Sequence, residues 1–173
     1  MSLFESAKYT VMNKETRKIE LREYPTFYIA KTTTSLDQNY NNGFNQVFNY
    51  IGGQNESKEK ISMTTPVIST STADSLTTGF VIPTKFSNHA PKPTNENVSL
   101  SKIEKGLFLA IKFSGNWTKE NFDKYDHILL SYIEKTDFNI ISERYILRYQ
   151  PPFIPSVFRR NEIMYRVELN KKQ

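Results

Sequence analysis

Cysteine is absent from the 173 residues, and histidine occurs only twice, at His89 and His127. Without cysteine the chain has no disulfide framework, thiolate zinc site, iron–sulfur cluster, cysteine nucleophile or thiolate haem ligand. Two histidines are too few for a metal site built from several imidazoles. Glycine-rich phosphate loops and the GxSxG and HExxH motifs are missing as well. We therefore expect neither a metal site nor an enzyme.

Long apolar runs are also missing. The amino-terminal stretch has an acid at Glu5 and no apolar segment of signal-peptide length, and the longest dense apolar stretch, Leu107 to Phe113, contains Lys112. These absences predict a cytoplasmic protein without a membrane span. With 38% hydrophobic residues, 12 Phe and 10 Tyr, the chain is too apolar to be disordered. At roughly 100–200 residues per domain, its length predicts a single domain, or two intimately packed halves.

The net charge of +5 is unevenly distributed. Residues 1–143 carry 16 basic and 16 acidic side chains, whereas residues 144–173 carry seven basic and two acidic ones. A protein that binds nucleic acid is expected to have a broad basic face with surface aromatics. One local cluster suits a small anion at least as well. We therefore expect no nucleic-acid partner.

The first half of the chain predicts two strands, a helix and two more strands. Alternation at 19–22 and the β-rich run 27–34 indicate a hairpin that turns at Tyr24-Pro25, and 63–69 and 79–82 indicate later strands. The helix between them ends at a pair of glycines. Its apolar face consists of residues at helical spacing, namely Tyr40, Phe44, Val47, Phe48 and Ile51.

The second half repeats this order. Residues 98–103 and 107–113 indicate a second hairpin, a helix begins near Thr118, and strands follow at 140–149 and 163–169. The helix has an apolar face formed by Phe122, Tyr125, Ile128, Leu129, Tyr132 and Ile133.

The repeated order predicts an α+β domain spanning residues 1–173, with pseudo-repeats at about 9–84 and 98–169. Its sheet is expected to be curved and covered by two helices, with pseudo-twofold symmetry.

A proline-rich apolar segment stands before the last strand. Residues 149–160 contain three prolines, which stiffen the chain and remove backbone donors. The segment carries Phe153, Ile154, Val157 and Phe158 and ends in Arg159 and Arg160. An apolar wall that ends in two guanidiniums fits a ligand with an apolar body and acidic tails. Alternatively, an arginine pairs with Glu162 or Asp126, and the loop only caps the core.

The remaining candidates are a methionine and the two histidines. Met63 near Lys58 and Lys60 could form the rim of a site for a flat apolar anion, or could be a core methionine beside solvated lysines. His89 lies in a loop and His127 on the polar side of the second helix. Both histidines are predicted to be exposed, so neither is expected to be a metal ligand.

Several segments together resemble the SOUL haem-binding protein family. In order, they are Tyr9–Val11, Ile19–Tyr24, Gly43–Asn55, Lys60–Val67, Phe80–Pro83, Phe113–Gly115, Tyr149–Pro155 and Arg160–Ile163. The resemblance covers residues from about 9 to 168. The combination of the MTTPV and PPFIP…RNE segments makes it specific.

The resemblance implies a distorted eight-stranded antiparallel β-barrel flanked by two helices. It also implies non-enzymatic binding of haem or another tetrapyrrole, as a carrier or buffer, in a shallow cleft between the first helix and the proline-rich loop. The implied cofactor-binding residues are Phe44, Val47, Phe48, Ile51, Lys60, Met63, Phe153, Val157, Phe158, Arg159 and Arg160. One branch of the family uses a histidine near the first helix as axial ligand, and this sequence has asparagine and glutamine there. No axial ligand is therefore assigned.

A protein-interaction module and a module that binds amphipathic small-molecule effectors are the alternative functions. The fold is also similar to bacterial effector-binding domains, whose sites for amphipathic cations commonly depend on a buried acid. The sequence identifies no such acid.

Overall fold

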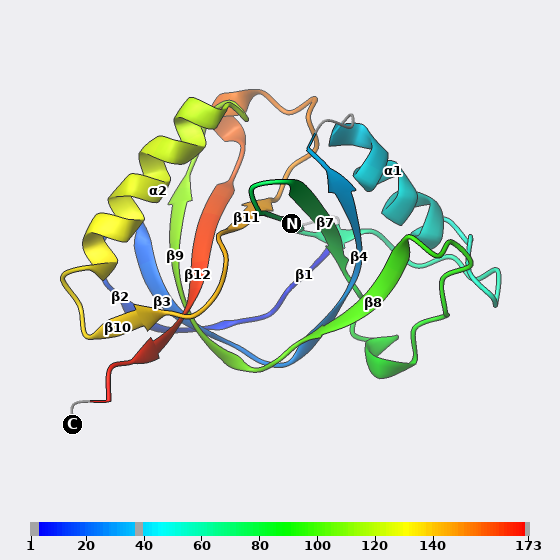
Figure 1. Ribbon diagram of the computed structural model, residues 1–173, viewed down its shortest axis with the longest axis horizontal. Coiled ribbons are helices and arrows are strands. Elements are labelled where there is room, and N and C mark those ends of the chain that lie inside the picture. Colours follow the sequence, from blue (N-terminus) through cyan, green and yellow to red (C-terminus); the bar gives the residue numbers. More distant parts are fainter. Residues whose placement is uncertain (1–3, 37–39, 172–173) are drawn as a thin grey trace. The chain divides into compact units, whose positions relative to one another are not determined.

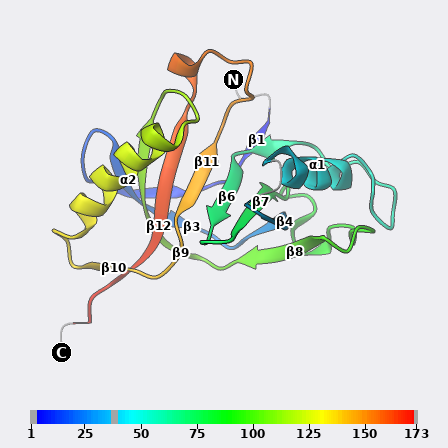
Figure 2. The ribbon, with the colours of Figure 1, turned by 45° about the horizontal axis from the view of Figure 1, so that its top comes forward.

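The computed structural model describes residues 4–36 and 40–171, which form an α+β fold of mainly antiparallel strands and two α-helices (Figures 1 and 2). The chain divides into two compact units. Unit 1 contains Met1–Ala7 and Thr26–Glu104, and unit 2 contains Lys8–Pro25 and Lys105–Gln173. Each unit has its own group of paired strands, its own helix and its own apolar core.

Unit 1 is built around a four-stranded antiparallel sheet in the order β6-β7-β4-β8. Its elements are β1 (Glu5–Ser6), β4 (Phe27–Ser35), α1 (Tyr40–Ile51), β5 (Thr64–Thr65), β6 (Val67–Ser71), β7 (Ser75–Val81), η1 (Ser87–His89) and β8 (Val98–Ile103). Helix α1 packs against β4, β7 and β8, and β1 pairs in parallel with β5. The strand predicted at 63–69 is divided at Pro66 into β5 and β6.

The helix predicted in the first half is confirmed as α1. Val47, Tyr50 and Ile51 are buried in the core of unit 1, whereas Asn45 and Asn49 are exposed. The helix ends at Ile51, and Gly53 just beyond it has a φ of 115°, which suits glycine after a helix. The side chain of Tyr40, predicted on the apolar face, lies outside the described part of the chain.

Unit 2 contains a five-stranded antiparallel path in the order β2-β3-β9-β12-β11, and β10 also pairs with β12. Its elements are β2 (Thr10–Lys14), β3 (Ile19–Tyr24), β9 (Gly106–Phe113), α2 (Lys119–Ile133), β10 (Phe138–Ile140), β11 (Tyr145–Arg148), η2 (Ser156–Phe158) and β12 (Asn161–Leu169). The strand predicted at 140–149 is thus two shorter strands.

The second helix also begins as predicted. Thr118 is its N-cap, with extended backbone angles and a side-chain oxygen that accepts a hydrogen bond from the Asn121 backbone N–H at 3.2 Å. Phe122, Leu129 and Ile133 of α2 are buried against the sheet. The helix therefore covers one face of the unit 2 sheet, beside β9 and β12 (Figure 1).

The two faces of the unit 2 sheet differ in chemistry. Ile111 of β9 is paired in register with Ile19 of β3 and with Ile163 of β12, and all three belong to the core beneath α2. Because side chains alternate along a strand, their neighbours point to the opposite face. That face carries Glu20, Arg22 and Lys112, among other residues, and most of this charge is paired, as described below.

Both predicted hairpins are wrong. Strand β3 pairs with β2 and β9, and β4 pairs with β7 and β8, so the chain does not reverse at Tyr24-Pro25. Likewise β8 pairs with β4, and β9 with β3 and β12. The physical reason is that the unit boundaries fall at 25/26 and 104/105, where the chain leaves one unit and enters the other.

The predicted closed eight-stranded barrel is also wrong, and the duplicated pattern is not confirmed. Among the described residues, β6 and β8 of unit 1 do not pair with each other, nor do β2 and β11 of unit 2. Each sheet buries its apolar face under its own helix, so closure is not needed to shield that face. The predicted repeat 9–84 joins strands of both units.

Candidate functional site

A cleft of about 330 Å³ in unit 2 brings four of the predicted site residues together. We call it the basic cleft, and it is lined by Lys18, Lys112, Phe113, Ser114, Tyr125, Val157, Phe158, Arg159 and Arg160. The proline-rich loop and η2 supply the predicted residues. The end of β9, the residue before β3 and helix α2 supply the others.

Two lysines that the sequence analysis did not single out contribute to the cleft. The Nζ of Lys18 lies 5.1 Å from the ring centroid of Tyr125, and the Nζ of Lys112 lies 3.1 Å from Oε1 of Glu20. Four of the lining residues are cationic and none is acidic. The cleft is therefore suited to an anion.

Arg159 holds the proline-rich loop in place. Its Nε donates to the carbonyl of Ile154 at 2.8 Å, and its Nη2 donates to that of Pro152 at 2.6 Å. The guanidinium also lies over Trp117, 4.7 Å from the ring centroid. Two of the three guanidinium nitrogens of Arg159 therefore donate hydrogen bonds to carbonyls of the loop.

Arg160 faces a different set of partners. It donates from Nε to Glu162 at 2.9 Å and from Nη2 to the Tyr9 hydroxyl at 3.0 Å, and it lies 3.9 Å from the ring centroid of Tyr149. Burial alone would lower the pKa of Arg160, but the charge of Glu162 outweighs it and raises the pKa. The alternative in which an arginine pairs with Glu162 is thus confirmed for Arg160.

The loop that ends in these arginines exposes large apolar side chains. Phe153, Val157 and Phe158 are 82%, 68% and 74% exposed. The loop is stiffened by prolines, and the N–H of Gly115 donates to the carbonyl of Ser156 at 2.9 Å. Apolar side chains grouped on a rigid exposed loop are typical of a surface that binds a ligand or another protein.

A buried acid, which the sequence analysis did not identify, lies beside the basic cleft. Glu162 is fully buried and accepts hydrogen bonds from both Arg22 and Arg160. The Tyr149 hydroxyl donates to its Oε2 at 3.2 Å. Burial is the main cause that raises the pKa of Tyr149, and it raises the pKa of Tyr24, beside Arg22, to about 12. The acid is therefore neutralised by two guanidiniums and surrounded by neutral phenols.

The predicted wall on the first helix lies in unit 1. Val47 and Ile51 are buried, and Phe44 and Met63 pack partly buried against the same core. Phe48 is half exposed, and its ring stacks on Phe44 with centroids 5.9 Å apart.

Lys60, the remaining residue of this wall, is exposed. The first-helix residues and the proline-rich loop belong to different units, and their joint role in one cleft stays a prediction.

Both histidines are exposed, as predicted. Within residues 4–36 and 40–171, no three His, Asp or Glu side chains lie close enough together to hold a metal ion. Over the same residues, no helix is both long and apolar enough to cross a membrane.

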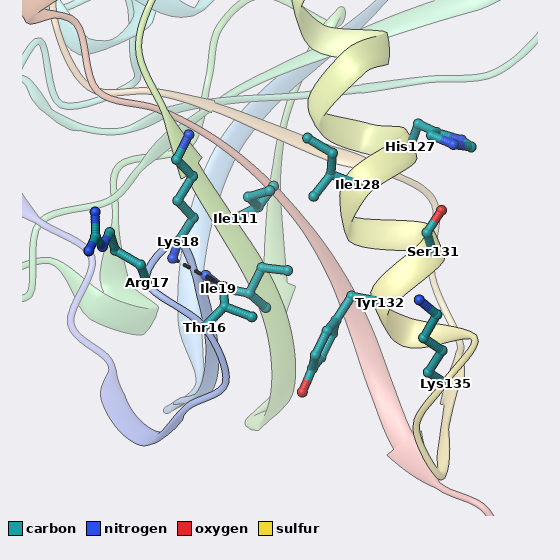
Figure 3. A pocket seen from close by; sticks show the side chains of 10 residues that line it. All are labelled: Thr16, Arg17, Lys18, Ile19, Ile111, His127, Ile128, Ser131, Tyr132 and Lys135. Atoms are coloured by element: carbon teal, nitrogen blue, oxygen red, sulfur yellow. Dashed lines mark hydrogen bonds between the residues drawn. The ribbon is translucent and has the colours of Figure 1, made fainter.

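A second concavity of unit 2, of about 510 Å³, lies between the β2–β3 turn and α2 (Figure 3). We call it the helix groove, and it is lined by Thr16, Arg17, Lys18, Ile19, Ile111, His127, Ile128, Ser131, Tyr132 and Lys135. Lys18 lines both the helix groove and the basic cleft.

Solved structures with the same type of fold share little sequence with this chain. The EcmrR C-terminal domain is 10% identical with a TM-score of 0.65, covering 88% of this chain and 98% of that chain. A hydrolase from Listeria innocua is 11% identical with a TM-score of 0.63, covering 90% and 94%. SAV2435 bound to tetraphenylphosphonium is 10% identical with a TM-score of 0.51, covering 87% and 94%. These similarities show the fold alone.

A family model identifies the chain more closely. The model of the SOUL heme-binding protein matches residues 4–166, nearly the whole length. The chain belongs to the SOUL haem-binding protein family, which confirms the resemblance seen in the sequence. No curated protein sequence gives a significant match.

Proposed function

We propose that this protein binds haem or another tetrapyrrole without catalysing a reaction, as a carrier or buffer. The observation that carries the proposal is the exposure of Val157 and Phe158 in a cleft with four cations. A tetrapyrrole has a flat apolar body and acidic propionates, so it complements both features. Membership in a haem-binding family supports the same ligand class.

In this proposal the propionates bind at the cations of the basic cleft. Lys18 pairs with a ring rather than with an acid among the described residues, which leaves its ammonium available to a carboxylate. Arg160 is partly exposed, so its outer edge is available as well.

The macrocycle covers the apolar loop. At about 25 cal/mol per Å², burying a few hundred Å² of porphyrin stabilises the complex by several kcal/mol before the cost of association. Phe158 is 74% exposed and supplies an aromatic ring against which a planar ligand can stack.

Iron is not required for this mode of binding. No axial ligand is assigned, so metal-free protoporphyrin is expected to bind about as tightly as hemin. Titration of both compounds, followed by absorbance and by quenching of the single tryptophan, tests the proposal. The absence of a saturable change for either compound at roughly 10–50 µM protein would remove it.

Two matched variants locate the site. Phe158→Asp places a carboxylate in the basic cleft, and we expect it to weaken porphyrin binding by about tenfold or more. Leu169→Asp makes the same kind of change at an exposed apolar residue outside the cleft and should leave affinity unchanged. Phe48→Ala tests the first-helix wall separately, because Phe48 is the most exposed apolar member of that wall.

Capture of a lipophilic cation is the competing small-molecule function, because SAV2435, whose fold is similar, is bound to tetraphenylphosphonium. Glu162 is a buried acid, but Arg22 and Arg160 already occupy its oxygens. We therefore expect tetraphenylphosphonium not to displace protoporphyrin.

The exposed loop also fits a protein-interaction surface. A pull-down that depends on Phe153 and Phe158, and that hemin does not inhibit, would favour that function over tetrapyrrole binding.

A further inference from the structure

The helix groove has an apolar floor formed by three elements. Ile19 of β3 and Ile111 of β9 face α2, and in Figure 3 Ile128 and Tyr132 extend from α2 toward them. Ile19 and Ile111 are almost completely buried, whereas Ile128 is 42% exposed. The groove therefore offers apolar surface to solvent above a packed base.

The walls of the helix groove are preformed. The Oγ1 of Thr16 accepts hydrogen bonds from the backbone N–H groups of Lys18 and Ile19, at 3.1 and 3.0 Å, which fixes the β2–β3 turn. On the α2 side of the groove, the hydroxyl of Tyr132 donates to the carboxylate of Glu15. Binding of a ligand would therefore cost little conformational entropy, because the turn and the tyrosine are already ordered.

The charged residues that line the helix groove have one sign. Arg17 and Lys18 stand on the turn, Lys135 stands on the helix, and the lining residues include no acid. The neighbouring acid Glu15 accepts the hydrogen bond of Tyr132. An apolar floor with a cationic rim complements an anionic amphiphile.

We propose that the helix groove binds one free long-chain carboxylate, with its aliphatic chain on the floor and its carboxylate at Arg17 and Lys18. Three of the four floor residues are isoleucines, which suit a flexible chain better than a flat macrocycle. A volume of about 510 Å³ lies within the usual range of small-molecule sites. This inference does not depend on the proposed tetrapyrrole function.

Titration of the full chain with cis-parinarate, a fluorescent fatty acid, tests the proposal. We expect a saturable rise in fluorescence that oleate reverses and that dodecyltrimethylammonium, a cation with an aliphatic chain, does not reverse. Equal displacement by the cation would overturn the proposal, because binding would then reflect apolar surface alone.

Paired variants test the position of the site. Ile128→Glu should weaken parinarate binding by about tenfold or more, because it places a carboxylate on the floor. The control is Ile140→Glu, at a similarly exposed isoleucine outside the groove. Arg17→Glu reverses a charge at the proposed carboxylate site and should also weaken parinarate binding. Arg17 is exposed, so this change does not disturb the core, and Lys14→Glu, at another exposed cation, is its control. Unchanged affinity in both Ile128→Glu and Arg17→Glu would overturn the proposal.

The same variants separate this site from the basic cleft. Ile128→Glu should retain porphyrin binding, and Phe158→Asp should retain parinarate binding. Loss of parinarate binding in Phe158→Asp but not in Ile128→Glu would assign the fatty acid to the basic cleft and overturn the proposal. Lys18 is left intact because it lines both sites.

Discussion

Arg22 and Glu162 form a two-point ion pair in which neither side chain is exposed, with Nη1–Oε2 at 2.7 Å and Nη2–Oε1 at 2.9 Å. They come from β3 and β12, which lie on either side of β9. On β9, Arg22 is paired with Phe108 and Glu162 with Lys112, so Ala110 lies midway between these two positions on the same face. The small side chain of Ala110 leaves room for the guanidinium to cross the strand. The pair therefore ties three strands together.

Breaking this pair should be costly. Arg22→Met leaves Glu162 with Arg160 as its remaining cation, and Glu162→Gln leaves Arg22 with Glu20 as its remaining anion. We expect each variant to lower the free energy of unfolding by about 3 kcal/mol, the lower end of the range for a broken buried pair. The double variant Arg22→Met/Glu162→Gln combines the same two substitutions, removes both charges and should be more stable than either single variant. Urea unfolding measures the three values. A double variant whose loss equals the sum of the single losses would contradict the role of the pair.

Glu20 should contribute stability that disappears in acid. Burial alone would raise the pKa of Glu20, but Lys112 and Arg22 outweigh it and lower the pKa below its usual value of 4.5. A carboxyl with a lowered pKa in the folded state stabilises the fold above the pKa of the unfolded chain, and this contribution is lost as pH falls through the folded-state pKa. Wild type should therefore exceed Glu20→Gln in unfolding free energy at pH 7. If the difference in unfolding free energy between wild type and Glu20→Gln did not shrink below about pH 4.5, a lowered pKa of Glu20 in the folded state would be contradicted.

Periodicity and stop signals were sufficient to predict the helices and the irregular loop. The spacing of Val47 and Ile51 before two glycines predicted α1, and Thr118 predicted the start of α2. The prolines of the loop correctly indicated that it is not a strand. These features depend on neighbouring residues, so a single sequence carries them.

Strand pairing and the buried charges could not be predicted in the same way. The alternation of Ile19 and Leu21 with Glu20 and Arg22 is typical of a strand with one wet face. Burial of that face depends on Glu162, far away in sequence, and no local pattern indicates the partner. Similarly, the cleft lysines Lys18 and Lys112 look like ordinary solvated residues until β3 and β9 are paired.

The two histidines should not matter for porphyrin affinity. Both are exposed, and neither lines the basic cleft. We expect His89→Ala/His127→Ala to bind hemin within about twofold of wild type, because a coordinate bond would be worth far more than this change. Absorbance titration in the Soret region measures the affinity. A loss of more than tenfold would show that a histidine ligates the iron.

The propionates should contribute through charge. Mesoporphyrin and its dimethyl ester have the same macrocycle, but the ester has no anion to pair with Lys18 or Arg160. We expect the ester to bind about tenfold more weakly at low ionic strength, with a smaller difference in high salt because the site is partly exposed. Equal affinity of the two porphyrins would show that apolar burial alone accounts for binding.

Tyr50 offers a test in unit 1. Its hydroxyl is buried and donates to the carbonyl of Pro91 at 2.7 Å, so Tyr50→Phe should cost about 1 kcal/mol by leaving that acceptor without its donor. Burial raises the pKa of Tyr50 to about 12. A raised pKa means that the fold favours the neutral phenol, so its contribution is complete below about pH 10 and is lost as pH rises toward 12. The difference in unfolding free energy between wild type and Tyr50→Phe should therefore be constant from pH 7 to 9 and fall above pH 10. A difference that stayed constant to pH 12 would show that the phenol ionises equally easily in the folded and unfolded chains.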